Sequence, residues 1–287
     1  HTMSLKMGVS SLQTLSKDHI SVLRAIWKKE KLYDKVKSDI TWALKTIIKS
    51  YDNNCDLKKV KAELVPSILT ANEWTSWSTK ARKILQEDPS FGVNPTNIDL
   101  YVVRDRPISI EEKLFNEFKA QKNFFARIDL LMMFSERAEP DSEYFAEMFS
   151  YFAGYLKAFN QVNEQVIASY LVVKQLVAKH PHLNPGLQYN FAELFSEIED
   201  PSSVYIALKD SGLKRSYLQD IKNFLINWPD IYVKLFPSVL SVDIIQSLVL
   251  DGYTEKVQTL ADLCFDNYRD YREGAIWFSK NSQEADW

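Results

Sequence analysis

The segment that decides the fold class runs from Glu73 to Ser109 and reads EWTSWSTKARKILQEDPSFGVNPTNIDLYVVRDRPIS. It joins an amphipathic segment bearing tryptophans to a loop rich in Pro, Asn and Asp, and then to a new helix start. Thr70 and Glu73 have the spacing of a capping box, in which two side chains satisfy the free backbone N–H groups of a first helical turn. We therefore expect a helix that runs to about Glu87, where Asp88-Pro89 ends it.

The same segment contains one plausible strand, Leu100–Val103, whose four residues are LYVV. Asn94-Pro95 marks a turn before it. A single strand leaves its backbone hydrogen-bonding groups unpaired. We therefore expect this strand to pair with something outside the chain or to lie extended against helices.

Outward from this segment, apolar residues recur at the spacing of helices in both directions. Ser16, Ser38 and Asp200 are candidate N-caps, the last with Pro201 at the first helical position, and Ser109 begins a second capping-box pattern. The expected helices before the deciding segment cover residues 16–29, 39–51 and 57–64. Those after it cover residues 109–132, 142–159, 162–179 and 189–198.

The C-terminal half contains a weak internal repeat with an offset of 42 residues. Leu218, Asp220 and Ile221 recur as Leu260, Asp262 and Leu263, and Leu235-Phe236 recurs as Trp277-Phe278. Two helices in about 40 residues is the period of HEAT-like solenoids. We predict an all-α fold, an irregular HEAT/TPR-like helical-repeat array with a small irregular segment near residues 88–108. The expected domains are residues 1–108 and 109–287, within a fragment of a longer protein.

The bulk composition agrees with a helical protein of the cytoplasm. The chain has 287 residues, 46% of them hydrophobic, and its 7 glycines are too few for glycine-rich phosphate loops or turn-rich β folds. No apolar run is long enough to span a membrane. Cys55 and Cys264 have no partner spacing, so we expect two thiols, and the alternative is a disulfide.

Charge is distributed unevenly along the chain. Residues 1–125 carry 21 Lys and Arg against 15 Asp and Glu, whereas residues 126–287 carry 14 against 23. These counts give net charges of +6 and −9. Such an asymmetry is expected when one half faces a polyanion or an acidic partner, and the alternative is ordinary variation among solvated helix faces.

The sequence contains no motif that indicates catalysis. The motifs of phosphate-binding loops, zinc proteases, serine hydrolases and calcium loops are all missing from it. His180 and His182 can offer two imidazoles to a metal, but no third ligand is implied. We therefore predict no catalytic residue, no metal site and no cofactor.

Basic residues near aromatic ones are the best candidates for a partner or nucleic-acid surface. The candidates are Lys58, Lys59, Lys61, Lys80, Arg82, Lys83, Arg104 and Arg106. Trp74 and Trp77 lie close to the second cluster and can in principle stack on bases. Because they are three residues apart, on the face that also carries the aliphatic residues, we expect them to pack in the core.

Several short patterns resemble the long N-terminal extension of some bacterial Gre-type transcript cleavage factors, as in spirochaetes and chlamydiae. They are Leu64-Val65-Pro66-Ser67, EWTSW with KARKILQEDPSFG, Tyr101 to Pro107, Ser109 to Glu112, and Tyr271-Arg-Glu273 with Ala275-Ile276-Trp277. The first residues, HTMSLKM, are similar to a further piece of the extension, and the alternative is that residues 1–3 derive from a vector. Ser78 departs from the pattern, which has a second tryptophan there.

The resemblance implies a role in transcription elongation. Gre factors insert a coiled coil with an acidic tip into RNA polymerase, and they dock through an FKBP-like domain. Neither part matches this sequence, so no catalytic residue is carried over. We expect an accessory, non-catalytic interaction domain that docks on RNA polymerase or an associated partner. The alternatives are a helical-repeat scaffold unrelated to transcription and, less favoured, an all-α enzyme with acidic residues in a groove.

Overall fold

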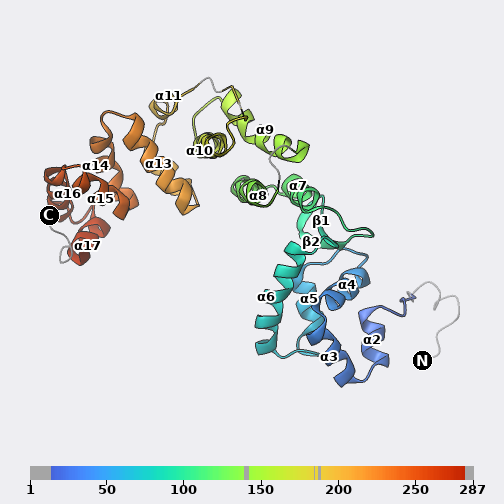
Figure 1. The fold of residues 1–287 in the computed structure, drawn as a ribbon. Helices are drawn as coiled ribbons and strands as arrows, with labels where there is room; N and C mark the ends of the chain where they lie inside the picture. Colours follow the sequence, from blue (N-terminus) through green and yellow to red (C-terminus); the bar gives the residue numbers. More distant parts are fainter. Residues whose placement is uncertain (1–13, 139–141, 184, 187–188, 282–287) are drawn as a thin grey trace. The chain divides into compact units, whose positions relative to one another are not determined.

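The computed structural model describes residues 14–138, 142–183, 185–186 and 189–281. The beginning of the chain, HTMSLKM, lies outside the described residues. The chain divides into two compact units, residues 1–145 and 146–287, which we call the N-terminal and C-terminal units (Figure 1). The described part is mostly helical, as predicted.

The N-terminal unit contains seven helices and one hairpin in its described part, and α9 begins at its end. In chain order these are α2 (Ile20–Ile26), α3 (Lys29–Ser38), α4 (Ile40–Ser50), α5 (Leu57–Leu64), α6 (Ala71–Glu87), β1 (Phe91–Asn94), β2 (Asn97–Val103), α7 (Ile110–Ala120) and α8 (Phe124–Arg137). The hairpin packs on α4, α6 and α7 (Figure 1). A core cluster within residues 20–103 is built from aliphatic side chains together with Cys55, Trp77 and Phe91. Phenylalanines of α7 and α8, such as Phe118 and Phe134, are also buried.

The helix from Thr70 to Glu87 forms as predicted. Thr70 Oγ1 accepts a hydrogen bond from the Glu73 backbone N–H, and the Glu73 carboxylate accepts one from the Thr70 N–H at 3.0 Å, so the capping box is complete. At the other end, the Lys113 ammonium group donates to the Leu85 carbonyl at 2.6 Å and to the Asp88 carbonyl at 3.0 Å. Lys113 thus satisfies carbonyl groups that the end of α6 leaves free.

The prediction of an unpaired strand was wrong. Phe91 pairs with Val103 in an antiparallel hairpin, so β2 finds its partner twelve residues earlier in the same chain. On its other side, Cys55 and Tyr101 exchange backbone hydrogen bonds at 3.2 and 2.9 Å. The irregular segment near residues 88–108 therefore contains a regular hairpin. Its first strand was not predicted, because Gly92 and Asn94 are residue types of low strand propensity.

Several helix boundaries also differ from the predictions. The helix expected over residues 16–29 begins at Ile20, with His19 rather than Ser16 as its cap, and α3 was not foreseen. Asp39, not Ser38, caps α4. The helix expected over residues 109–132 is interrupted after Ala120, and Asn123 caps α8. The helix over residues 57–64 has the predicted bounds.

The C-terminal unit is helical throughout its described part. Its helices are α9 (Glu143–Lys157), α10 (Glu164–Lys179), α11 (Phe191–Ser196), α12 (Pro201–Ala207), α13 (Ser211–Phe224), α14 (Trp228–Val239), α15 (Val242–Leu250), α16 (Thr254–Asp266) and α17 (Arg272–Asn281), of which α9 begins in the preceding unit. Asp200 caps α12 with Pro201 at its start, as predicted. Phe236 and Phe278 are buried and pack at 5.3 Å between ring centroids, which joins α14 to α17.

Candidate partner-binding surfaces

The first group of predicted basic residues lies on α5. Lys58, Lys59 and Lys61 are all exposed there, while Val60 and Leu64 face the core. Asp56 caps this helix by accepting a hydrogen bond from the Lys59 backbone N–H at 2.7 Å. The capped, anchored helix therefore presents three ammonium groups to solvent.

The second group lies on α6. Lys80, Arg82 and Lys83 are exposed, while Trp77 is buried and donates from Nε1 to the Val36 carbonyl at 3.0 Å. Trp74 stacks on Trp77 with ring centroids 5.5 Å apart. The expectation that the tryptophans pack inward, rather than stack on bases, is confirmed for Trp77. Within the part of the chain that the structure describes, the basic residues of both groups form no ion pair.

Arg104 and Arg106 differ from each other. Arg106 is exposed, but Arg104 is half-buried and its guanidinium group lies against Gly92. A Cβ atom at Gly92 would lie 2.5 Å from Arg104 Nη2, so a larger residue there would displace the guanidinium group. Arg104 Nε is buried without a hydrogen-bond partner among the described residues. Arg104 therefore belongs to the packing of the hairpin and contributes less to the exposed basic surface.

Two charged groups near the hairpin have shifted pKa values because they are buried. Burial lowers the pKa of Lys113, against the attraction of Glu117 and Asp88. Burial also raises the pKa of Glu117, against the attraction of Lys113 and Arg104. Since Lys113 joins α7 to the end of α6, this pair serves the packing of the unit. Sequence reasoning did not identify it, because an isolated lysine carries no signal of burial.

The two histidines considered as metal ligands lie with their ring centroids 6.0 Å apart. Among the described residues, no group of three or more His, Cys, Asp or Glu side chains is arranged to hold a metal ion. Cys55 and Cys264 are free, buried thiols. No helix in the described ranges has the length and apolar character needed to cross a membrane.

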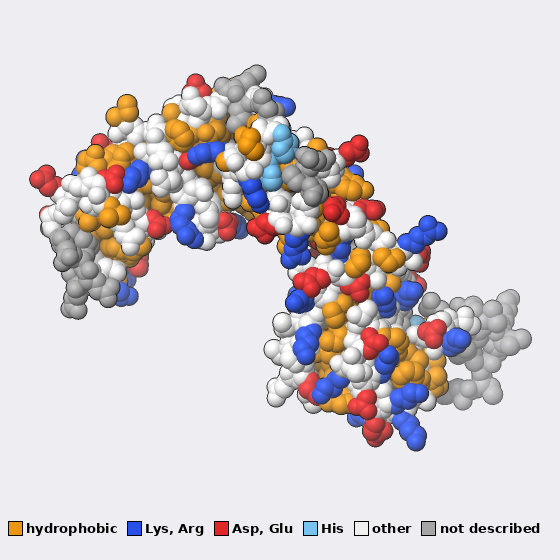
Figure 2. Space-filling view, viewed as in Figure 1, with side chains coloured by type: hydrophobic (Ala, Val, Ile, Leu, Met, Phe, Trp, Pro, Cys, Tyr) orange, Lys and Arg blue, Asp and Glu red, His pale blue; other side chains and the backbone are white. Residues whose placement is uncertain are grey.

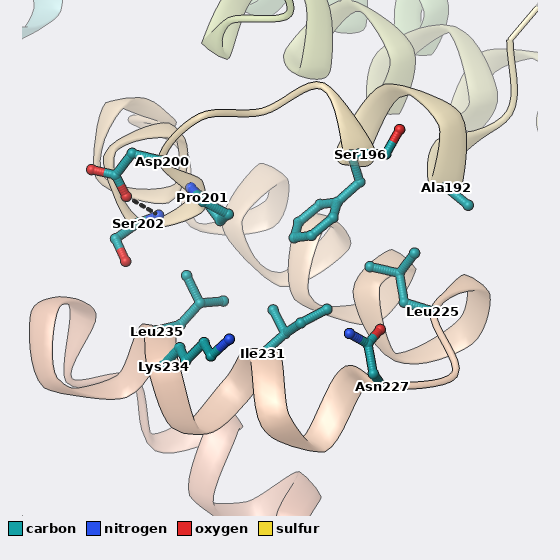
Figure 3. Close-up of a pocket in the computed structure, with 11 residues that line it drawn as sticks. Ala192, Ser196, Asp200, Pro201, Ser202, Leu225, Asn227, Ile231, Lys234 and Leu235 are labelled. Carbon is teal, nitrogen blue, oxygen red and sulfur yellow. Dashed lines mark hydrogen bonds between the residues drawn. The ribbon is translucent and has the colours of Figure 1, made fainter.

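Sequence reasoning missed a groove in the C-terminal unit, with a volume of about 590 Å³ (Figure 3). It lies between α11 and α12 on one side and the start of α14 on the other. Figure 3 shows Ile231 and Leu235 of α14 pointing toward the segment that carries Ser196 and Pro201. Its walls are mainly apolar, and its polar groups come from Asp200, Ser202, Asn227 and Lys234, among others.

Exposed apolar side chains flank this groove. Ile226, between the groove residues Leu225 and Asn227, is fully exposed, and the nearby Phe224 is 48% exposed. Others in the same unit include Ile206, Leu250, Phe265 and Tyr268. Figure 2 shows such hydrophobic side chains at the surface among polar ones. The apolar run Phe224-Leu225-Ile226, which begins at the last residue of α13, is the sequence signal that could have indicated this surface.

Comparison with known proteins identifies relatives of both regions. Residues 110–287 match the family model described as the GreA-associated C-terminal domain, and residues 21–108 match that of the GRAD helix-turn-helix domain. The chain is 54% identical over 280 residues to a putative GreA-associated domains protein of Treponema pallidum (strain Nichols). It is 33% identical over 288 residues to transcription elongation factor GreA of Borreliella burgdorferi.

These matches cover 98% of this chain but only 43% and 32% of the two relatives, so the chain spans less than half of their length. No solved structure matches. The resemblance to Gre-type factors that the sequence indicates is confirmed by these relatives and by both family models.

Proposed function

This chain belongs to the family of GreA-associated domains, and we propose that it is an accessory, non-catalytic part of a cytoplasmic Gre-type transcription elongation factor. On this proposal the chain docks on RNA polymerase or a protein associated with it. A second attachment point raises the effective concentration of a cleavage module at the polymerase without new contacts at the catalytic centre.

The observation that carries this proposal is the apolar groove with the exposed Ile226 beside it. Protein interfaces are organised around apolar anchor residues in a desolvated centre, with a polar rim around them. Phe195, Ile231 and Leu235 supply an apolar centre here, and Asp200 and Lys234 supply polar groups at the edge. An apolar pocket with an exposed apolar side chain beside it offers a place where an anchor residue of a partner can be buried.

A helical-repeat arrangement of the C-terminal unit would suit this role. From α11 onward, each helix packs on the next one or on the next but one along the chain. Stacked helix pairs of this kind bury a continuous core and leave long surfaces for partners.

The docking proposal is tested by retention of the full chain on immobilised cognate RNA polymerase at two salt concentrations. We expect the unmodified chain to be retained, and Ile226→Asp to reduce retention at least about tenfold because it places a charge beside the apolar centre. Leu250→Asp is the control, since Leu250 is also exposed, at 82%, lies on α15 and does not line the groove.

Two outcomes would contradict the proposal. One is no retention of the unmodified chain at either salt concentration, which would favour a scaffold unrelated to transcription. The other is equal loss of retention in Ile226→Asp and in the control variant Leu250→Asp, which would mean that the groove has no particular role.

A further inference from the structure

The order of elements in the N-terminal unit points to a specific binding mode. After α4, the extended Cys55 pairs with β2. Then α5, a short connection over residues 65–70, α6 and the hairpin β1–β2 follow, before α7. This order, a helix-turn-helix followed by a two-stranded hairpin, is that of a winged helix. In a helix-turn-helix, the second helix is the one that enters a DNA groove. That helix is α6 here, and α5 is the first helix of the pair.

The outward side of α6 has the chemistry of a groove-reading helix. With Trp77, Ala81 and Leu85 facing inward, the opposite side presents exposed amide, hydroxyl and basic side chains. These are Asn72, Thr75, Ser76, Thr79, Arg82 and Lys83. Such side chains bond to base edges and phosphate oxygens.

Glu73 is the one carboxylate between Ala71 and Gln86, and its oxygens already accept hydrogen bonds within the unit. Glu73 Oε1 accepts from the Tyr33 hydroxyl at 2.5 Å and from Lys37 Nζ at 3.1 Å, and Oε2 accepts from the Thr70 N–H at 3.0 Å. The negative charge of Glu73 is therefore compensated on the inner flank of α6. It does not oppose a polyanion on the outer side.

Charge complementarity favours a nucleic acid over a protein at this face. Residues 21–108 carry 16 Lys and Arg against 11 Asp and Glu, a net charge of +5. The exposed side of α6 contains no aromatic or large aliphatic anchor, unlike the groove of the C-terminal unit. The 17 residues of α6 extend about 25 Å, and the major groove of B-DNA admits a helix, whereas that of duplex RNA is too narrow.

We propose that the N-terminal unit binds double-stranded DNA with α6 in the major groove. The lysines of α5, Lys58, Lys59 and Lys61, contact the phosphates beside it. The hairpin contributes little charge, since Asp99 is exposed on β2 and no basic residue precedes Arg104 within it. This surface is separate from the apolar groove, so either proposal can fail without the other.

The test is fluorescence anisotropy of a labelled mixed-sequence DNA duplex of about 20 base pairs, roughly two helical turns, titrated with the full chain. Titrations at about 50 and about 200 mM salt give the slope of log affinity against log salt. Reversing two charges in Arg82→Glu/Lys83→Glu is expected to weaken binding at least about tenfold and to reduce the slope by about 2. Lys58→Glu/Lys61→Glu, on α5, is expected to do the same.

The matched control is Lys209→Glu/Lys280→Glu, which makes the same change of net charge at two exposed lysines of the C-terminal unit and is expected to bind DNA as the unmodified chain does. Circular dichroism verifies the fold of each variant. The proposal is overturned by an absence of binding at the lower salt concentration. Equal affinity for a duplex RNA of the same sequence, or equal weakening in the control variant, would also overturn it.

Discussion

At the scale of single residues, the side chain of Asn53 makes the hydrogen bonds that a neighbouring strand would make to the end of β2. Its backbone has a φ of 56°, in the left-handed region that Asn tolerates better than most residues. Its side chain donates to the Val103 carbonyl at 2.9 Å and accepts from the Val103 N–H at 2.8 Å. One amide thus satisfies both backbone groups at the end of β2.

Two replacements of Asn53 separate the contribution of its side-chain hydrogen bonds from that of its tolerance of positive φ. We expect Asn53→Gly to lower the free energy of unfolding by about 1–3 kcal/mol, because two groups of Val103 lose their partner. Asn53→Ala should cost about 1 kcal/mol more, since alanine is strained at positive φ. Urea unfolding followed by tryptophan fluorescence measures both. Unchanged stability in the glycine variant would contradict the role of the amide.

The Glu73 carboxylate should make the stability of the N-terminal unit depend on pH. Hydrogen bonds from Tyr33 above all, then from Thr70 and Lys37, lower the pKa of Glu73 to about 2 from an ordinary value of 4.5. Because the folded pKa is the lower one, the ionised group stabilises the fold above pH 4.5. This stabilisation is lost as the pH falls from there toward 2.

The variant Glu73→Gln cannot lose a charge in this range. We therefore expect the unmodified chain to be more stable than Glu73→Gln at neutral pH, and the difference to shrink as the pH falls below 4.5. Thermal unfolding at several pH values measures it. A difference that stays constant with pH would mean that the Glu73 charge does not contribute.

At this scale, the sequence alone predicts a hydrogen bond only when its two partners lie close together along the chain. Asn53 lies between the helices expected over residues 39–51 and 57–64, and the chain is indeed not helical there. The partner of Asn53 lies 50 residues away, and no local pattern indicates it. The capping box of Thr70 and Glu73 was predictable because both partners lie within one helical turn.

At the scale of elements, helix existence was easier to predict than helix boundaries. The apolar stripe continues across Gln121–Asn123, where the chain nevertheless turns, and only Asn123 as a cap marks the start of α8. The repeat is similarly incomplete. Asp220 is buried and paired with Lys174, whereas Asp262 at the equivalent position is exposed. Periodicity identifies the apolar positions of a helix but not the partners of its polar ones.

The contact between α16 and α17 depends on a small residue. A Cβ atom at Gly274 would lie 2.7 Å from the Sγ atom of the buried Cys264. We expect Gly274→Ala to destabilise the C-terminal unit by about 1–3 kcal/mol through this overlap. Cys264→Ala removes the sulfur, so the double variant should be more stable than the sum of the two single effects predicts.

Urea unfolding of the two single variants, the double variant and the unmodified chain gives the four free energies of unfolding of this double-mutant cycle. Strict additivity would show that the two positions do not interact. Gly154 provides a control, because a Cβ atom there meets nothing within 4 Å, so Gly154→Ala should not destabilise its helix.

At the scale of the whole molecule, the two matched regions differ in charge and in surface chemistry. Residues 110–287 carry 17 Lys and Arg against 26 Asp and Glu, a net charge of −9, in contrast to the +5 of residues 21–108. The charge asymmetry was predictable because it needs only counting. The apolar groove was not, because its walls come from residues 192–235 on several helices that only the fold brings together.

The two proposed activities should therefore be separable by substitution. We expect Ile226→Asp to lose retention on RNA polymerase and keep DNA affinity, and Arg82→Glu/Lys83→Glu to do the reverse. Measuring both activities on both variants tests this. If either variant lost both activities while remaining folded, the assignment of one activity to each surface would be wrong.

The stacked indoles of the N-terminal unit have an optical consequence. Trp27 and Trp42 lie nearly parallel at 5.7 Å between centroids, and Trp74 lies over Trp77 on the inner side of α6. Neighbouring rings at such separations couple their electronic transitions and give the unit its own dichroic signature. Because both rings of the second pair belong to α6, a rigid movement of that helix leaves their signal unchanged. A molecule that disturbs the packing of the two rings against each other changes the signal, and such binding can be followed without a dye.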